Sequence, residues 1–380
     1  MPKWAWSNDE NLFIYIVGAV PCGRPMKRIG KRRSSMVTIR IIICGFGRVG
    51  QTFAQLLLSK GESLRRHDDL ELKVVAAVDI GGAAVSEEGL PLADLLAHVK
   101  EGGRVETFQS FEKEGLSGTA VLSEGIADLL VETTPTNIVD GEPGLTHLRT
   151  ALSHGLHVVT AAKGPLVIRY DELRSLAREK GKRLMLSAAT AAALPTLDIA
   201  LTSLAGTDIL SAEGILNGTT NYILTRMHED GVSYQEALKE AQKMGVAEPD
   251  PSLDVDGRDT ANKILLIANE VFHVNLTLKD IPVEGITGVT PSQIEEAKGK
   301  GMVIKLIGKV EKKGDRVMAS VAPVELSREH PLATVRGTEK AISYFTDTMD
   351  RVTVSGGKSN PLGAAAALLK DIINIYKPSP

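Results

Sequence analysis

The chain has 380 residues, of which 43% are hydrophobic and 24% are charged, and its formal net charge is −3. This length suffices for two domains, and a charge so close to zero gives no general attraction to nucleic acid or to an anionic membrane. Two cysteines, Cys22 and Cys44, cannot form a disulfide framework, which favours a reducing cytoplasm, and no apolar run reaches the roughly 18 residues of a membrane helix.

The first 35 residues differ in composition from the rest of the chain. They hold both tryptophans and a short apolar run that is followed, not preceded, by basic residues. A signal peptide carries its charges before the apolar run, so this order argues against one. Because a strand pattern begins directly after Met36, we predict that residues 1–35 are a disordered or non-native extension and that Met36 is the working start.

A glycine-rich loop follows the first predicted strand, Thr38–Cys44, and opens an amphipathic helix. The first glycine of this G-x-G-x-x-G arrangement allows a tight turn, the second lets backbone approach a pyrophosphate, and the third lets helix and strand pack closely. The loop therefore predicts that dinucleotide phosphates bind at the helix N-terminus. Its residues are Gly45, Phe46, Gly47, Arg48, Val49 and Gly50.

A second predicted strand, Glu71–Val78, ends at Asp79. An acidic residue there accepts a hydrogen bond from the adenine ribose 2′-hydroxyl, which favours NAD over NADP. Arg48 in the glycine loop can instead reach a 2′-phosphate, and Asp79 can equally cap the Gly-Gly turn that follows it. The sequence leaves the cofactor preference open.

Two further strand-and-loop units carry polar residues. The predicted strands Ala127–Val131 and His157–Val159 lead to Thr134 and Lys163, respectively. In an open parallel sheet the carboxyl ends of the strands line the ligand crevice, so we expect both residues near the nicotinamide. The alternative for Lys163 is a solvated loop lysine.

The second half brings together donors and charges. The loop Asn217–Asn221 offers several donors at a helix entrance, either as a cradle for a carboxylate or carboxamide or as ordinary helix capping. Further on, Asp259 and Lys263 are four residues apart on one helix face, and Glu248 and Asp254 lie on the irregular approach. These groups can hold an ammonium-bearing substrate and move a proton. The alternative is a surface loop that leads into an i,i+4 ion pair.

At this point the chain resembles the homoserine dehydrogenases, in their short, monofunctional form, over about 36–380. The last of five matching segments agrees with the family signature at every constrained position. The segments are CGFGRVG (44–50), VETTPTN (131–137), VVTAAKGPL (158–166), GILNGTTNYIL (214–224) and AQKMGVAEPDPSLDVDGRDTANK (241–263).

The resemblance implies an α/β fold with a Rossmann-type dinucleotide-binding domain over 36–192 and 340–380. A mixed α/β catalytic and dimerisation domain is expected over 193–339, with the strands around 301–325 as the seam of a homodimer. The implied reaction interconverts L-homoserine and L-aspartate 4-semialdehyde with NADP or NAD, in threonine, methionine and isoleucine biosynthesis.

The resemblance also assigns roles to single residues. Lys263 corresponds to the proton donor and acceptor, Asp259 to the carboxylate that orients it, and Lys163 to a lysine at the substrate and the nicotinamide. The residues implied in substrate binding are Glu248, Asp254 and Thr219. The residues implied in cofactor binding are Gly45, Phe46, Gly47, Arg48, Val49, Gly50, Asp79, Thr134, Lys163 and Gly356.

The chain departs from the family pattern in three places. Ala162 stands where the family has asparagine, the glycine-rich stretch reads Ser187 to Pro195 with alanines, and the C-terminal glycine-rich turn around Gly356 is altered. In the family, backbone carbonyls of the second stretch bind a monovalent cation such as Na⁺. The corresponding residues here are Ser187, Thr190, Ala192 and Leu194.

Two other functions remain compatible with the sequence. One is an NAD(P)-dependent dehydrogenase that acts on another small amino acid, and the other is a nucleotide-binding sensor that has lost turnover. The eight histidines show no H-E-x-x-H motif and no metal-ligand spacing with cysteine, and basic runs are confined to residues 1–35. We therefore expect a small-molecule substrate and neither a nucleic-acid nor a membrane partner.

Overall fold

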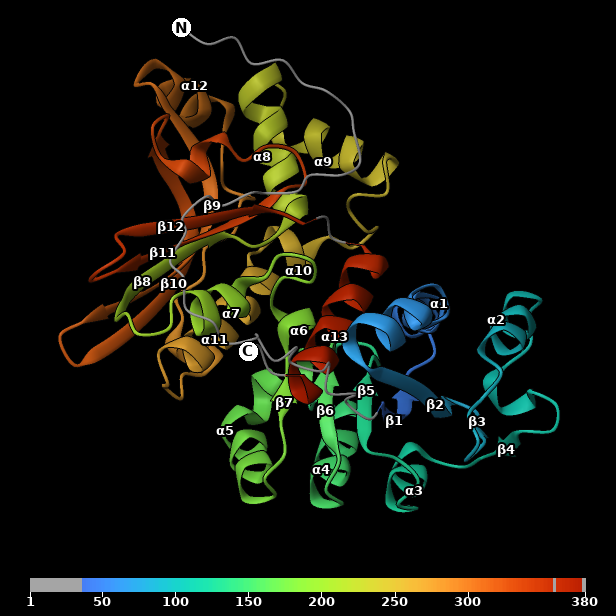
Figure 1. Cartoon of the computed structure of the whole chain (residues 1–380). Coiled ribbons are helices and arrows are strands. Elements are labelled where there is room, and N and C mark those ends of the chain that lie inside the picture. The colour runs from blue at the N-terminus through green and yellow to red at the C-terminus, as the bar shows by residue number, and fades with distance from the viewer. Residues whose placement is uncertain (1–35, 358–359, 378–380) are drawn as a thin grey trace, which may run out of the picture. The chain divides into compact units, whose positions relative to one another are not determined.

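The computed structural model describes residues 36–357 and 360–377, so the expected extension 1–35 lies outside the described residues. Within the described ranges the chain forms two β-sheets, one of mainly parallel and one of antiparallel strands, with helices around both (Figure 1). The predicted α/β class is confirmed.

The first sheet is the dinucleotide-binding part. Its central strands pair in parallel, whereas β3 and β4 add an antiparallel edge beyond β2. In spatial order the strands are β4 (Glu112–Glu114), β3 (Gly82–Val85), β2 (Leu70–Asp79), β1 (Val37–Cys44), β5 (Leu129–Glu132), β6 (His157–Thr160) and β7 (Leu184–Met185).

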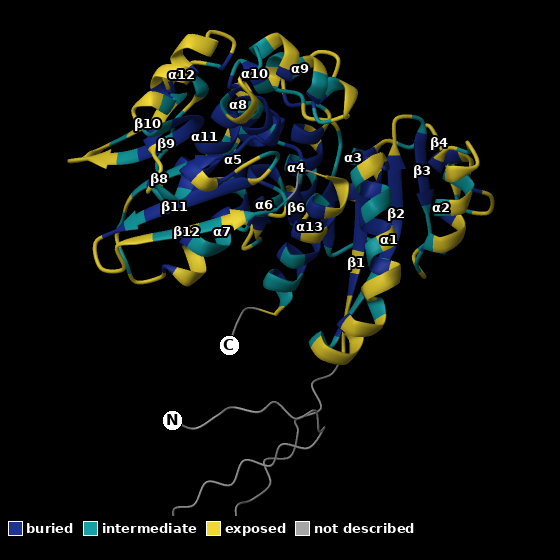
Figure 2. Ribbon diagram, turned by 90° about the horizontal axis from the view of Figure 1, so that it is seen from above, coloured by how far each residue is buried: buried dark blue, intermediate teal, exposed yellow. Residues whose placement is uncertain are grey.

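Strand β1 shows why this sheet is buried on both faces, as Figure 2 makes visible by its dark blue colour. Alternate residues such as Ile41 and Ile43 pack into one core, and Ile42 and Cys44 pack into another on the opposite face. Side chains alternate across a strand, so a run of β-branched residues supplies both cores. The helices on the first face are α1 (Arg48–Ser63), α2 (Leu92–Lys100) and α13 (Pro361–Tyr376), and those on the second are α3 (Gly118–Ser123), α4 (Gly144–Ser153) and α5 (Gly164–Glu179).

The second sheet has five antiparallel strands. Helices α8 (Gly218–Asp230), α11 (Arg258–Val271) and α12 (Pro291–Gly299) pack against β9. The spatial order of the strands is β10 (Arg316–Ser327), β9 (Met302–Lys313), β8 (Ile209–Ile215), β11 (Lys340–Thr346) and β12 (Arg351–Gly356).

The structure corrects the expected return to the nucleotide-binding part at residue 340. Strand β11 pairs with β8, with Ala341 opposite Ile215, and β12 pairs with β11. Strand β11 therefore lies between β8 and β12, and its almost continuous burial is that of an inner strand covered on both faces. Among the described residues, the chain therefore rejoins the first sheet only with α13.

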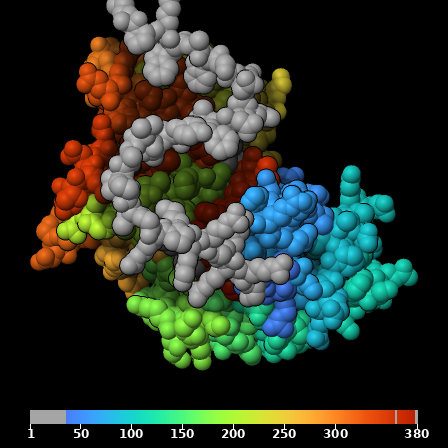
Figure 3. Space-filling model, in the orientation of Figure 1, coloured from blue at the N-terminus to red at the C-terminus, as the bar shows by residue number. Residues whose placement is uncertain are grey.

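Helix α13 closes the first sheet. It begins at Asn360, whose side chain accepts a hydrogen bond from the backbone N–H of Gly363, and its residues Leu368 and Ile372 share a core with Phe53 of α1. In the space-filling view its dark red atoms lie beside the blue atoms of α1 (Figure 3). The last helix of the chain thus stabilises the first helix of the nucleotide-binding fold.

None of the helices in the described ranges is both long enough and apolar enough to cross a membrane.

Candidate active site

A cavity of about 830 Å³ lies where the carboxyl ends of the first sheet meet the start of α8 and α11. All six residues predicted for catalysis and substrate binding contribute to its wall, and so do two further residues predicted for the cofactor alone. The six are Lys163, Thr219, Glu248, Asp254, Asp259 and Lys263, and the two are Val49 and Thr134. Residues far apart in the sequence therefore share one cavity.

Lys263 and Asp259 form the centre of the site. Both come from the first two turns of α11, so the i,i+4 spacing places them on one face. Lys263 is buried, and its Nζ donates to Oδ2 of Asp259 at 2.5 Å and to the carbonyl of Leu216 at 2.8 Å. The ammonium group is thus held in one position at the cavity wall.

Asp259 remains ionised although its side chain is only 15% exposed. Burial by itself would raise the pKa of this carboxyl group, but the charges of Lys263 and Lys163 and hydrogen bonds from Lys263 and Asn217 outweigh that effect. They hold the pKa well below its ordinary value. The Nζ of Lys163, which lies at the end of β6, is 3.6 Å from Oδ1 of Asp259, so one carboxylate connects the two lysines.

Asn217 was not among the predicted site residues, although the donor-rich loop that contains it was recognised. Its Nδ2 donates to Oδ1 of Asp254 at 2.6 Å and to Oδ2 of Asp259 at 2.9 Å. Its Oδ1 accepts from the backbone N–H of Thr220 and so caps α8. One side chain therefore fixes the helix start and holds two carboxylates at a defined separation.

The rim of the cavity carries a carboxylate that is open to a ligand. Glu248 is exposed, and within the described ranges no hydrogen bond or ion pair engages its carboxylate. Gln242 holds the backbone at this point by donating to the carbonyls of Glu248 and Pro249, each at 3.2 Å. Thr219 donates its hydroxyl to the carbonyl of Val246 at 3.0 Å, which ties the start of α8 to the same loop.

The glycine loop has the geometry that a dinucleotide requires. A Cβ on Gly45 would lie 2.6 Å from the backbone nitrogen of Thr134, and a Cβ on Gly50 would lie 2.3 Å from the carbonyl oxygen of Gly45. The space around Gly47 is open, and no side chain caps the N-terminus of α1. The first N–H groups of this helix are therefore available to phosphate oxygens.

The residues expected to bind the adenine ribose of the cofactor are not among those that line the cavity. Asp79 is exposed at the end of β2, and its Oδ1 accepts from the backbone N–H of Ile80 at 2.9 Å. Arg48 is exposed at the first position of α1. Phe46 is a core residue, so only its backbone faces the loop, where its carbonyl accepts from Gln51.

Comparison with known proteins agrees with this geometry. Residues 195–373 match the homoserine dehydrogenase family, and residues 45–187 match the NAD-binding domain of homoserine dehydrogenase. A homoserine dehydrogenase of Methanocaldococcus jannaschii is 40% identical over 336 residues, which cover 88% of this chain and 98% of that protein. The chain belongs to the homoserine dehydrogenase family.

Two further relatives indicate the range of cofactors within the homoserine dehydrogenases. An NAD(+)-dependent homoserine dehydrogenase of Pseudomonas canavaninivorans is 36% identical over 90% of this chain and 97% of that protein. The structure of a hyperthermophilic archaeal homoserine dehydrogenase in complex with NADPH aligns with a TM-score of 0.78 at 25% identity, covering 90% of this chain and 99% of that chain. This member of the family is an oxidoreductase.

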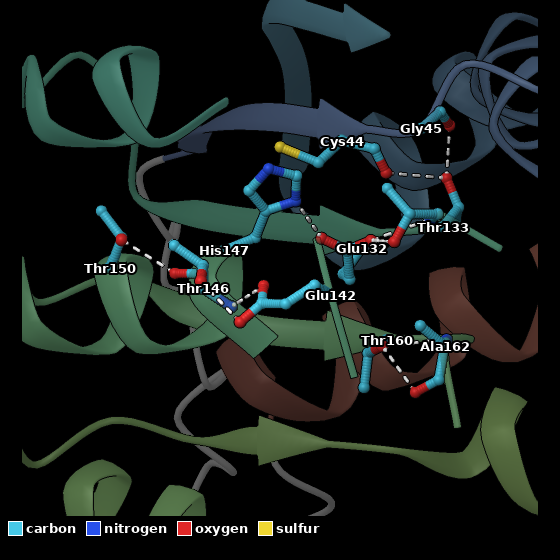
Figure 4. A network of polar contacts seen from close by, with 11 residues as sticks. Cys44, Gly45, Glu132, Thr133, Glu142, Thr146, His147, Thr150, Thr160 and Ala162 are labelled. Carbon is cyan, nitrogen blue, oxygen red and sulfur yellow. Dashed lines mark hydrogen bonds and ion pairs between the residues drawn. The ribbon is translucent and has the colours of Figure 1, made fainter. Parts of the chain in front are cut away.

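A buried network supports the cavity wall in this homoserine dehydrogenase fold (Figure 4). Glu132, at the end of β5, accepts from Nδ1 of His147 at 2.9 Å and from the backbone N–H of Thr134 at 2.8 Å. Cys44 lies beside them, and burial raises the pKa of its thiol. Because both oxygens of the Glu132 carboxylate are hydrogen-bonded, the cluster holds the Thr134 loop in place. No sequence motif links these residues, since helix α4 brings His147 to the sheet.

The residues expected to bind a monovalent cation lie in the segment that leads away from β7. Ser187 and Thr190 belong to the one-turn helix α6 (Ser187–Thr190), and Ala192 has a left-handed backbone with φ of 53°. Only Ala192 of the expected four lines the cavity. Gly356, expected at the cofactor, ends β12 opposite Lys340 and does not line it.

Proposed function

We propose that the chain interconverts L-homoserine and L-aspartate 4-semialdehyde with NAD or NADP, as a step of threonine, methionine and isoleucine biosynthesis. The observation that carries this proposal is the pair Lys263–Asp259 in a cavity that the glycine-loop residue Val49 also lines. The acid–base group and the dinucleotide loop thus face one space.

The residues Lys263, Asp259 and Lys163 move and position the proton in this proposal. A bound nicotinamide supplies the hydride for the aldehyde carbon, or takes it from the alcohol carbon in the opposite direction. Lys263 donates a proton to the oxygen that becomes the alcohol, and Asp259 keeps the ammonium group oriented. Lys163, on the other side of Asp259, adds positive charge near that oxygen.

The substrate amine binds to two other carboxylates that line the same cavity. Glu248 and Asp254 are the acceptors, because an ammonium group forms strong, charge-assisted hydrogen bonds with carboxylates. Asn217 sets the position of Asp254, and Thr219 anchors the loop that carries Glu248. This division places the reacting carbon between the amine site and Lys263.

The cofactor is held by the glycine loop and the helix start of α1. The open backbone at Gly47 leaves room for the pyrophosphate, whereas Gly45 and Gly50 allow the close packing of the loop, and Thr134 lies toward the nicotinamide. Asp79 and Arg48 decide between NAD and NADP, since they accept a ribose hydroxyl and attract a 2′-phosphate, respectively.

We further propose a cytoplasmic homodimer. The second sheet ends at strand β10, where Met318 and Val324 are 52% and 38% exposed, and such an edge favours association with a second copy. The buried thiol of Cys44 is compatible with a reducing compartment. Analytical ultracentrifugation, with Met318→Glu as the disrupting variant, tests the assembly.

One spectrophotometric assay separates this function from its alternatives. Purified chain with L-homoserine and NAD⁺ or NADP⁺ is expected to produce absorbance at 340 nm. A dehydrogenase of another amino acid responds only to that amino acid, and a nucleotide-binding sensor binds the cofactor without turnover. Absence of turnover with homoserine under both cofactors would overturn the proposal.

A further inference from the structure

A buried lysine that neither the substrate nor the cofactor sites use lies in the wall of the cavity. Lys340, the first residue of β11, is only 1% exposed, and its Nζ donates to the carbonyl of Ala191 at 2.6 Å. Among the described residues no carboxylate pairs with this ammonium group. Burying a charge without a charged partner costs folding free energy, so we asked what this ammonium group does in its buried position.

The carbonyl that Lys340 holds lies inside the segment where a monovalent cation is expected. Ala191 stands between the expected ligands Thr190 and Ala192. Two of the four expected carbonyls already accept hydrogen bonds, since Ser187 accepts from the hydroxyl of Thr190 at 2.9 Å and Leu194 accepts from the N–H of Thr196 at 2.8 Å. The carbonyl of Ala191 itself also accepts from the N–H of Leu194 at 3.3 Å.

Other groups of the chain hold the same segment from outside. Ser187 binds Asp371 through both its N–H and its hydroxyl, and just beyond the segment Tyr344 donates to the carbonyl of Thr196 at 2.9 Å. A bound Na⁺ would have to share adjacent carbonyls with the ammonium group of Lys340, and like charges in a buried site repel strongly. The residues present therefore do not fit a monovalent cation.

We propose that the ammonium group of Lys340 takes the place of a monovalent cation in this chain. It supplies the positive charge at the carbonyls of 187–194 and ties strand β11 of the second sheet to the segment that follows the first. The reaction then needs no added Na⁺ or K⁺. Burial and the charges of Lys263 and Lys163, opposed in part by the charge of Asp259, lower the pKa of Lys340 to about 7, so the group carries its charge in mildly acidic solution.

The test compares cations at constant ionic strength. The full chain is assayed at about pH 6.5, where a group of pKa near 7 is mostly protonated. L-aspartate 4-semialdehyde and NADH or NADPH are the reactants, in choline chloride, NaCl or KCl at about 100 mM. Choline is too large to enter a carbonyl site. We expect the wild-type kcat/KM to differ by less than about twofold between the salts.

The variant Lys340→Met is expected to depend on added Na⁺ or K⁺ for full activity. Its kcat/KM in choline chloride falls by about tenfold or more, and NaCl or KCl restores part of the loss. Its melting temperature rises with NaCl, because an ion that binds only the folded state stabilises it. The matched control is Lys305→Met: Lys305 is also buried and donates to the carbonyl of Val335 at 2.6 Å, but it lies outside the cavity. This control is expected to lose stability without any selective response to Na⁺ or K⁺.

The inference rests on the proposed function only in its activity measurement. If no reactant pair turns over in any salt, the function fails, and the melting temperatures still decide the role of Lys340. A wild-type protein whose rate or melting temperature rises with Na⁺ or K⁺ relative to choline would overturn the inference. So would a folded Lys340→Met variant that responds to neither cation. If that variant does not fold, the wild-type comparison decides alone.

Discussion

The Nζ of Lys263 lies 2.5 Å from Oδ2 of Asp259, and the same carboxylate is 3.6 Å from the Nζ of Lys163. Removal of the Lys263 amine should therefore affect the proton transfer and not the dinucleotide loop. For Lys263→Met we expect kcat to fall by about 10³-fold, within the usual range for a lost acid–base group. Fluorescence titration with NADH is expected to give an unchanged Kd.

The exposed Lys239 is the control for this substitution. Lys239→Met is expected to retain both turnover and binding. Equal loss of kcat and of NADH affinity in Lys263→Met would contradict the assigned role.

Asn217 acts both as a helix cap and as a clamp on two carboxylates, and two substitutions separate these functions. Asn217→Asp keeps an acceptor for the N–H of Thr220 but places a third carboxylate beside Asp254 and Asp259. We expect kcat/KM for homoserine to fall by at least about tenfold, since one lost charge-assisted hydrogen bond costs about 1.5–3 kcal/mol.

Asn217→Ala loses the cap as well, which costs about 1 kcal/mol of the free energy of unfolding. Urea denaturation of the two variants measures that difference. Wild-type kinetics in Asn217→Asp would show that the clamp has no part in the reaction.

The cofactor preference depends on a choice between Asp79 and Arg48. Asp79→Ser removes the acceptor for the ribose hydroxyl, so we expect kcat/KM with NAD to fall about tenfold while the value with NADP stays level or rises. Arg48→Gln is expected to lower only the value with NADP. Steady-state kinetics with both cofactors measures the ratio, and the exposed Asp94→Ser serves as the control. An unchanged ratio in both variants would place cofactor selection elsewhere.

The hydrogen bonds of Glu132 to His147 and Thr134 should contribute to both stability and cofactor binding. Glu132→Gln replaces one acceptor oxygen by an NH₂ group that faces a donor, either His147 or Thr134. A buried mismatch of this kind costs about 2 kcal/mol of the free energy of unfolding, and the KM for the cofactor rises as the loop loosens. Glu124→Gln, on the exposed end of α3, should be neutral. Wild-type stability in Glu132→Gln would contradict the stabilising role of this network.

The buried amine of Lys340 should make stability depend on pH. Burial and the nearby charges of Lys263 and Lys163 lower its pKa from 10.5 to about 7 in the folded chain. Between these two values the unfolded chain binds more protons than the folded chain, so this contribution to stability rises with pH. Relative to Lys340→Met, the wild-type protein is expected to gain up to about 3 kcal/mol between pH 7 and pH 9.5. Urea denaturation at both pH values measures this, and a difference that does not change would contradict the lowered pKa.

The sequence predicted the parts of the site that local patterns determine. The glycine loop, the i,i+4 pair Asp259–Lys263 and the donor-rich loop 217–221 each carry their information within a few neighbouring residues. The structure brings all three to one cavity. The end of a parallel strand accounts only for the glycine loop, because loop 217–221 follows β8 of the antiparallel sheet and the pair lies on α11.

What could not be predicted depends on contacts between distant segments. His147 reaches Glu132 only because α4 packs on the sheet, and Lys340 reaches Ala191 across 149 residues. The domain boundary expected at residue 340 was misplaced for a similar reason: a continuously buried strand has the same composition in either sheet, and only its partners decide.

The chain crosses from the first sheet to the second after α6 and comes back after β12. At these two crossings the chain makes contact, since a Cβ on Gly357 would lie 2.8 Å from the backbone nitrogen of Leu194. We expect any opening of the cavity for substrate to bend the chain at this corner, where both connections can move together. The hydrogen bond from Lys340 to Ala191 would limit that movement.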